Sequence, residues 1–158
     1  MEGENIIITG ANRGIGKELV KVFAEAGANI WACMRKENED FISWKSELEQ
    51  IHNVWIKTVC FDITDSESFD IGIKSILDEN IKIDVLINNA GISTVKLLNK
   101  SKLEEVKALF NVNYFSMLNM IQKISKKMVR QKSGVIINMG SIAGIEPQPG
   151  KIAYGSSK

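Results

Sequence analysis

The stretch Thr9-Gly10-Ala11-Asn12-Arg13-Gly14-Ile15-Gly16 decides the fold that we expect for this chain. An apolar run, residues 6–8, precedes it, and a helical pattern follows it, so the order is strand, glycine turn, helix. The apolar face of that helix is expected to carry Ile15, Leu19, Val22, Phe23 and Ala26. Gly10 would permit the sharp turn, Gly14 a close approach of the backbone to a pyrophosphate, and Gly16 close packing of helix on sheet. Free N–H groups of the first helical turn would then face an anion, which predicts phosphate binding, with a purely structural turn as the alternative.

Length and composition fit one globular domain. The chain has 158 residues, of which 44% are apolar and 25% charged, and its net charge of +1 argues against a nucleic-acid or anionic-membrane partner. The acidic start is unlike a signal peptide, and no apolar run approaches membrane-spanning length, so we expect a cytoplasmic protein. Cys33 and Cys60 each end an expected strand among apolar neighbours, which predicts two buried, reduced thiols.

Arginines mark the region where the second strand, residues 29–34, is expected to end. Gly27 is predicted to cap the preceding helix, Arg35 follows the strand, and Arg13 lies in the glycine turn. In a dinucleotide site an acidic residue at this strand end would bond the ribose 2′-hydroxyl, but no carboxylate occurs here before Glu37. Arginine suits a 2′-phosphate, so we predict that NADP(H) is preferred and that NAD(H) is possible. A solvated loop arginine is the alternative for Arg35.

Three further strands are expected at residues 54–61, 83–87 and 135–138, each separated from the next by a helical pattern. The apolar positions of the second and third helices are Phe41, Trp44, Leu48, Ile51, Phe69, Ile73, Ile76 and Leu77. Helix starts are predicted at Thr64 with Glu67 and at Ser101 with Glu104. Five alternating strands predict a doubly wound parallel α/β sheet, a Rossmann fold in one domain, with its ligand at the carboxyl ends of the strands. The single histidine, His52, has no cysteine or carboxylate cluster near it in the sequence, so no metal site is predicted.

One polar residue interrupts the apolar stripe of the longest helical pattern. The stripe runs through Leu103, Val106, Phe110, Met117, Met120 and Ile124. Between Phe110 and Met117 its spacing falls on Asn113. A buried amide must be hydrogen-bonded or it costs stability, so packing alone does not explain an asparagine there.

Tyr154 and Lys158 stand one helical turn apart and would share a helix face. An ammonium beside a phenol stabilises the phenolate, so the pair would act as an acid–base catalyst. The spacing alone occurs often by chance. The turn Asn88-Asn89-Ala90-Gly91 after the fourth strand, however, suits close packing against a ligand.

Together these motifs resemble the classical short-chain dehydrogenase/reductase family, and within it the reductases of 3-oxoacyl-acyl-carrier-protein type. Thr9-Gly10-x-x-x-Gly14-x-Gly16 resembles the cofactor turn of the family, and Asn88-Asn89-Ala90-Gly91 its fourth-strand motif. Asn113, Ser141, Tyr154 and Lys158 match its catalytic tetrad in order and approximate spacing. The resemblance spans residues 5–158.

The resemblance implies a role for each matching residue. Tyr154 would be the general acid toward a carbonyl or base toward an alcohol, and Ser141 would polarise that oxygen. Lys158 would assist the tyrosine and hold the nicotinamide ribose, Asn113 would anchor a water of the proton relay, and Asp62 would bond the adenine amino group. The implied cofactor contacts are Gly10, Asn12, Arg13, Gly14, Ile15, Gly16, Arg35, Asp62, Ile63, Asn89, Ala90, Gly91, Tyr154 and Lys158.

Members of the family continue past the lysine with two more strands and a substrate-covering segment, and they typically form homo-oligomers. The sheet is therefore expected to be incomplete at its C-terminal side. An NADP-preferring oxidoreductase acting on a small carbonyl or alcohol is predicted. The alternatives are an inactive nucleotide-binding fragment or interaction domain and, less favoured by the glycine spacing, an extended-branch sugar epimerase.

Overall fold

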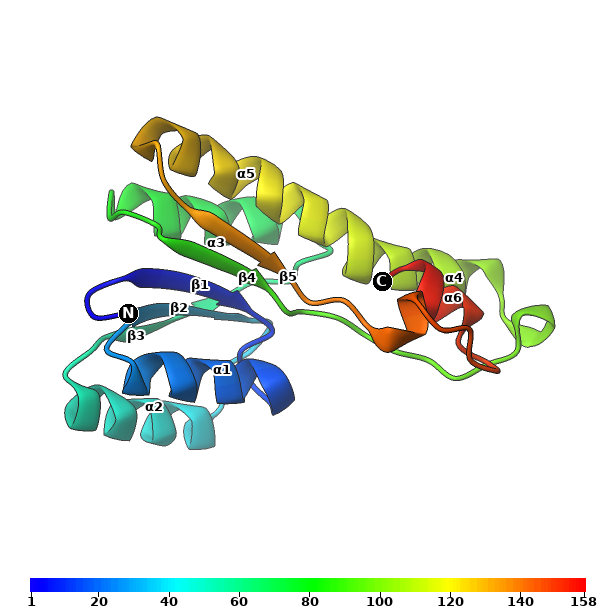
Figure 1. The fold of residues 1–158 in the computed structure, drawn as a ribbon, viewed down its shortest axis with the longest axis horizontal. Coiled ribbons are helices and arrows are strands. Elements are labelled where there is room, and N and C mark those ends of the chain that lie inside the picture. Colours follow the sequence, from blue (N-terminus) through cyan, green and yellow to red (C-terminus); the bar gives the residue numbers. More distant parts are fainter.

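The computed structural model describes all 158 residues as one parallel sheet flanked by helices (Figure 1). The strands are β1 (Asn5–Thr9), β2 (Asn29–Met34), β3 (Ile56–Cys60), β4 (Val85–Asn88) and β5 (Val135–Asn138). Their order is β3-β2-β1-β4-β5, and every neighbouring pair is parallel. The chain moves outward from β1 to β3 and then returns to the other side of β1, which confirms the predicted doubly wound sheet.

Helices cover both faces of the sheet. They are α1 (Gly14–Glu25), α2 (Glu39–His52), α3 (Ser66–Asp78), α4 (Leu103–Phe110), α5 (Ser116–Gln131) and α6 (Ile152–Ser156), with short turns η1 (Leu98–Lys100), η2 (Asn111–Phe115) and η3 (Ile142–Gly144). In Figure 1, α1 and α2 lie on one face, α3 and α5 lie on the other, and α4 and α6 extend beyond the ends of β4 and β5. Because both faces are covered, the inner strands β1, β2 and β4 are mostly continuous apolar runs rather than alternating ones.

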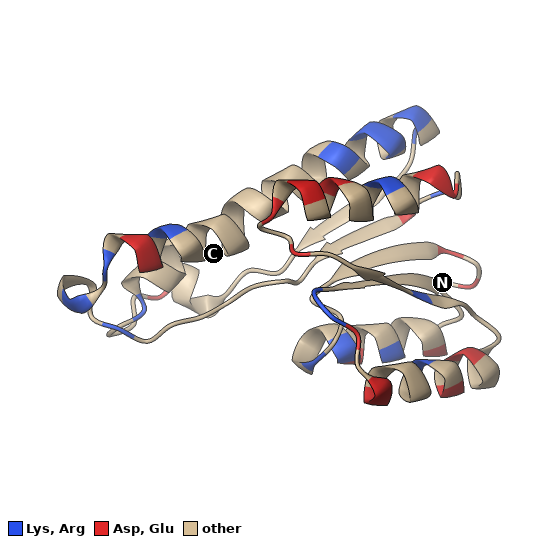
Figure 2. Ribbon diagram, turned by 180° about the vertical axis from the view of Figure 1, so that it is seen from behind, with Lys and Arg blue, Asp and Glu red and all other residues tan.

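Two hydrophobic layers hold the sheet between the helices. Ile6 and Ile8 of β1 point into the layer shared with α1 and α2, whereas Ile7 points into the layer shared with α3 and α5. All three are fully buried, and each such side chain stabilises the fold by about 1.5–3 kcal/mol relative to an exposed one. Helices α2 and α3 each carry several acidic residues and one lysine, and the strands carry little charge (Figure 2). No helix is long and apolar enough to cross a membrane.

The face of α1 that meets the sheet was predicted only in part: Leu19 and Phe23 pack against the core, but Ile15, Val22 and Ala26 are exposed. Its buried residues are Gly16, Val20 and Ala24, whereas Ile15 is 63% and Val22 49% exposed. A Cβ atom on Gly16 would lie 2.0 Å from the carbonyl oxygen of Gly10, so this glycine is the point of closest approach. The helix therefore contacts the sheet most closely through Gly16 and through Val20 and Ala24, which follow it by four and eight residues, rather than through its most apolar positions. Gly27 has φ +79° just after the helix, as predicted for a C-terminal cap.

Both predicted helix starts are wrong by one residue. The N-cap of α3 is Asp65, whose carboxylate accepts the N–H of Ser68 at 2.7 Å, while the Thr64 hydroxyl is bound to Asp62. Aspartate is a strong capping residue, and Thr64 is already occupied. At α4 the Lys102 N–H donates to the Glu105 carboxylate at 3.0 Å. The Ser101 hydroxyl instead donates to the carbonyl of Leu97.

Exposure corrects three further predictions. Cys33 is buried and Cys60 exposed, both as free thiols, because β3 is an edge strand. Burial, together with the nearby Cys60 thiol, raises the pKa of Cys33 well above its ordinary range. Ile51 and Leu103 were predicted to lie on buried apolar stripes, but they are 63% and 62% exposed. The opposite sheet edge is β5, with Val135 55% exposed.

Candidate active site and cofactor cavity

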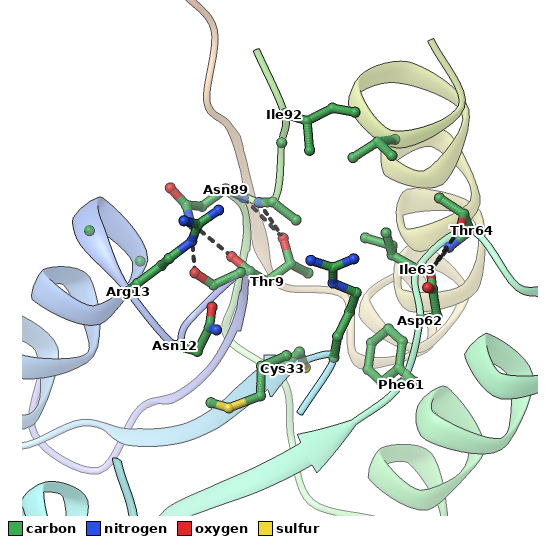
Figure 3. Close-up of a pocket in the computed structure, with 18 of the residues that line it drawn as sticks. Thr9, Asn12, Arg13, Cys33, Phe61, Asp62, Ile63, Thr64, Asn89 and Ile92 are labelled. Carbon is green, nitrogen blue, oxygen red and sulfur yellow. Dashed lines mark hydrogen bonds between the residues drawn. The ribbon is translucent and has the colours of Figure 1, made fainter. Parts of the chain in front are cut away.

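A cavity of about 800 Å³ opens where β1, β2, β3 and β4 end (Figure 3). Its lining comes from the glycine turn, the ends of β2 and β3 and the turn after β4. Every predicted cofactor residue between Gly10 and Gly91 lines it. The lining residues are Thr9, Gly10, Asn12, Arg13, Gly14, Ile15, Gly16, Cys33, Met34, Arg35, Phe61, Asp62, Ile63, Thr64, Asn89, Ala90, Gly91, Ile92 and Val112.

The glycine turn has the shape needed to receive an anionic ligand. Gly10 and Gly14 have φ values of +68° and +54°, the left-handed region that favours glycine. A Cβ on Gly14 would meet no atom within 4 Å, so the backbone here borders open space. Arg13 is the N-cap of α1 without a side-chain cap bond, and the first turn holds no acidic residue. The first-turn N–H groups and the positive end of the helix dipole are therefore free for a ligand.

Thr9 fixes the turn after β4 onto the glycine turn. Its hydroxyl accepts the N–H groups of Asn89 and Ala90, each at 3.0 Å. The Asn89 amide in turn donates to the carbonyls of Thr9 and Gly10 at 3.0 and 3.3 Å. The two turns that line the cavity are thus bonded as one unit. No role was predicted for Thr9, although a polar residue at the end of a buried apolar strand was a signal for one.

Arginines and one aspartate give the cavity its charges. Neither Arg13 nor Arg35 forms a salt bridge. Asp62 accepts the backbone N–H of Thr64 at 2.8 Å and its hydroxyl at 2.7 Å. These two bonds, with a smaller contribution from Arg35, outweigh partial burial and lower the pKa of Asp62. In Figure 3, Arg13 and Asp62 lie on opposite sides of the cavity.

Asn113 is buried and fully bonded, as its place on the apolar stripe required. It is 3% exposed and lies in η2, a π-helical turn that joins α4 to α5. Its amide accepts the N–H of Ile92 at 2.8 Å and donates to the carbonyl of the same residue at 2.9 Å. A third bond, of 2.8 Å, goes to the hydroxyl of Ser157. Asn113 therefore joins the turn after β4 to the segment that carries Tyr154 and Lys158.

Lys158 and Asn113 both lie next to Gly91, in the turn after β4. Its ammonium donates to the carbonyl of Met139 at 3.0 Å, just beyond β5. A Cβ built on Gly91 would meet the Lys158 ammonium at 3.1 Å and the Asn113 amide oxygen at 3.2 Å. Gly91 thus leaves room for both groups beside the cavity. Tyr154 and Lys158 themselves do not line the cavity.

The segments that carry Ser141 and Tyr154 pack tightly against each other. Ser141 is the N-cap of η3, and its hydroxyl accepts the N–H of Ala143 at 3.2 Å. A Cβ on Gly155 would lie 2.1 Å from the carbonyl oxygen of Ala143, so α6 rests directly on η3. Tyr154 is half-buried, with the Lys151 ammonium 5.1 Å from its ring centre.

Ser157 is a further buried polar residue that the sequence analysis missed. It accepts from Asn113 and donates to the carbonyl of Tyr154 at 2.7 Å. No periodic or compositional signal distinguishes it from Ser156. The structure holds no group of three or more His, Cys, Asp or Glu side chains able to bind a metal ion.

Comparison with known proteins shows the family of the chain. The family described as short chain dehydrogenase matches residues 4–158. The chain belongs to the short-chain dehydrogenase family. A relative over the whole chain is a 3-oxoacyl-acyl-carrier-protein reductase from Thermotoga maritima, 35% identical and covered over 63% of its own length. Another is dehydrogenase/reductase SDR family member 7B from Xenopus laevis, 30% identical over 97% of this chain and 49% of the relative.

A solved structure shows the same fold. It is that of a putative short-chain alcohol dehydrogenase from Sinorhizobium meliloti, with a TM-score of 0.90, 24% identity, and coverage of 100% of this chain and 62% of the other. The chain thus spans less than two thirds of the length of these short-chain dehydrogenases.

Proposed function

We propose that this short-chain dehydrogenase domain serves an oxidoreductase that prefers NADPH and transfers hydride between that cofactor and a ketone or secondary alcohol. The observation that carries the proposal is the cavity, where two arginines without salt bridges, Arg13 and Arg35, accompany a helix N-terminus without a side-chain cap. A small carbonyl or alcohol substrate, a cytoplasmic location and assembly into homo-oligomers belong to the same proposal.

The residues present fit a dinucleotide phosphate. Gly14 borders open space where any side chain would intrude, and the first turn of α1 offers N–H donors with no competing carboxylate. Arg13 and Arg35 would hold the 2′-phosphate, and Asp62 would accept from the adenine amino group. When bound, the cofactor supplies or accepts the hydride.

The chain's own side chains would handle the proton. Tyr154 would donate a proton to the carbonyl oxygen in reduction, or remove one from the alcohol in oxidation. Ser141 would hydrogen-bond the same oxygen, and the Lys158 ammonium would stabilise the tyrosine phenolate. The bonds from Asn113 to Ile92 and Ser157 would hold this segment beside the cavity.

A nucleotide-binding domain without turnover is the second candidate. It is favoured by the position of Tyr154 and Lys158 outside the cavity lining and by the Lys158 bond to Met139.

One measurement tests the cofactor assignment, and a second separates the two candidate functions. Dissociation constants for NADPH and NADH, taken at several salt concentrations, should favour NADPH, and Arg35→Ala should weaken NADPH binding by about tenfold while NADH changes little. NADPH oxidation with ketones and 3-oxoacyl thioesters should be lost in Tyr154→Phe, with NADPH affinity retained. Binding without any turnover would support the second candidate. Tighter binding of NADH than of NADPH would contradict the cofactor assignment.

A further inference from the structure

Three side chains next to the cavity form a closed polar network. Glu37 lies between β2 and α2, Lys45 lies on α2, and Thr58 lies on β3. The Thr58 hydroxyl donates to the Glu37 carboxylate and accepts from the Lys45 ammonium at 2.7 Å. Lys45 also pairs directly with the same carboxylate oxygen at 3.0 Å. Each member therefore bonds both of the others.

The network holds Glu37, the carboxylate nearest to Arg35 in the sequence. Glu37 follows Arg35 by two residues, a span of roughly 7 Å in extended chain, yet Arg35 lines the cavity and Glu37 does not. Its bonds to Lys45 and Thr58 hold the carboxylate toward α2 and β3. A free glutamate at this distance could turn toward Arg35, neutralise it, and repel a phosphate beside it.

The network is better protected than an ordinary surface ion pair. The side chains of Lys45 and Glu37 are only 17% and 25% exposed. Partial burial alone would raise the pKa of Glu37, but the bonds from Thr58 and Lys45, with the charge of Lys45, lower it instead. Glu37 is therefore fully ionised at neutral pH. The direction of its carboxylate decides how strongly it repels an anion bound nearby. The charged residues that line the cavity are Arg13, Arg35 and Asp62.

We propose that Lys45 and Thr58 are specificity-determining residues that keep Glu37 away from Arg35 and so leave the arginine free for a 2′-phosphate. This rests on the proposed NADPH preference. Releasing Glu37 would weaken binding of the 2′-phosphorylated cofactor and leave NADH binding unchanged or improved, since a free carboxylate suits a ribose 2′-hydroxyl.

The test compares dissociation constants for NADPH and NADH across a set of variants. Lys45→Met and Thr58→Val should each lower the NADPH-to-NADH preference by about fivefold or more. In the Glu37→Gln background neither change should alter the ratio, because no charge is left to release. Thr58→Val preserves shape, so it reports on the hydroxyl with little risk to folding.

Lys57→Met is the matched control for loss of a nearby positive charge. Lys57 neighbours Thr58 on β3 but pairs with Glu79 and does not line the cavity, so it should leave the ratio unchanged.

The possible failures are distinguishable. An unchanged ratio in Lys45→Met and Thr58→Val, with wild type preferring NADPH, would overturn the role of the network and leave the proposed function intact. A shift in Lys45→Met that persists with Glu37→Gln would mean that Lys45 acts on the phosphate directly, which also overturns it. Absence of NADPH preference in wild type would contradict the proposed function itself, and with it this inference.

Discussion

Replacing Asn113 by leucine should destabilise the domain, although the helical spacing alone suggests the opposite. Leucine would complete the apolar stripe on which Asn113 stands. The structure shows what the amide does instead, with one bond to the N–H of Ile92, one to its carbonyl and one to the Ser157 hydroxyl. All three partners would lose their bond in Asn113→Leu.

The size of the effect follows from those three bonds. Each contributes about 0.5–1.5 kcal/mol net, which gives about 3 kcal/mol in total, and the added apolar burial of leucine offsets part of it. Ile92 is 41% exposed, so water can partly replace the bond to its backbone, whereas Ser157 is 3% exposed and has no such access. We therefore expect a loss of about 2 kcal/mol in the free energy of unfolding, or about 4–8 °C in Tm for a chain of this length.

Urea unfolding followed by circular dichroism measures this loss directly. The matched control is Asn111→Leu, on the same π-helical turn, where the side chain is exposed and makes no hydrogen bond. That variant should stay within about 0.5 kcal/mol of wild type. If Asn113→Leu were as stable as Asn111→Leu with an unchanged m-value, the bonds of Asn113 would not be what holds this turn.

Three further changes test the turns and the polar network. Gly16→Ala should lower the free energy of unfolding by about 1–3 kcal/mol, because its Cβ would overlap the carbonyl of Gly10. Gly14→Ala faces open space but has φ +54°, so it should cost about 1–2 kcal/mol of backbone strain and also weaken NADPH binding. Urea unfolding and NADPH titration of both variants test this, and an unchanged NADPH affinity in Gly14→Ala would contradict it. Thr9→Val should cost about 1–3 kcal/mol, because it leaves the N–H of Ala90 without an acceptor, whereas the N–H of Asn89 keeps its bond to the carbonyl of Ile87. A Tm unchanged from wild type would show that the Thr9 bonds do not matter. Glu37 has a lowered pKa in the folded state, so its stabilising contribution is present above the unfolded pKa of about 4.3 and is lost as pH falls through the folded pKa. The difference in stability between wild type and Glu37→Gln should therefore be constant above about pH 5 and shrink below about pH 4, and a difference that grew in acid would refute the sign.

Local sequence signals predicted the sheet and the cavity lining because they act at short range. The apolar runs fixed the strands, and the glycines at positions 10, 14 and 16 fixed the turn, since few other residues tolerate φ above +50° or so close a backbone approach. The buried, hydrogen-bonded state of Asn113 was also predictable, because a buried amide needs partners. Its partners were not, since Ile92 and Ser157 meet it only through the tertiary fold.

The predictions that proved wrong also depended on tertiary packing, which the local sequence does not show. Ile15 was expected in the core because it is apolar, but Gly16 sets the rotation of α1 and leaves Ile15 exposed. Cys60 was expected to be buried because it ends an apolar strand, and only the strand order reveals that β3 is an edge. Thr58 and Lys45 gave no sequence signal, because their bond to Glu37 joins three separate elements.

The most direct test of the account is where NADPH binds on this chain. Titration with NADPH, followed through backbone amide resonances, should shift Gly14, Ile15 and Gly16 most strongly, because their N–H groups would receive the phosphates. The backbone amide resonance of Arg35 should shift more with NADPH than with NADH, since only NADPH carries the 2′-phosphate. Saturable binding with those shifts is the result that we expect. Shifts confined to surfaces outside the cavity, or no saturation at millimolar NADPH, would contradict the assignment of this cavity to the cofactor.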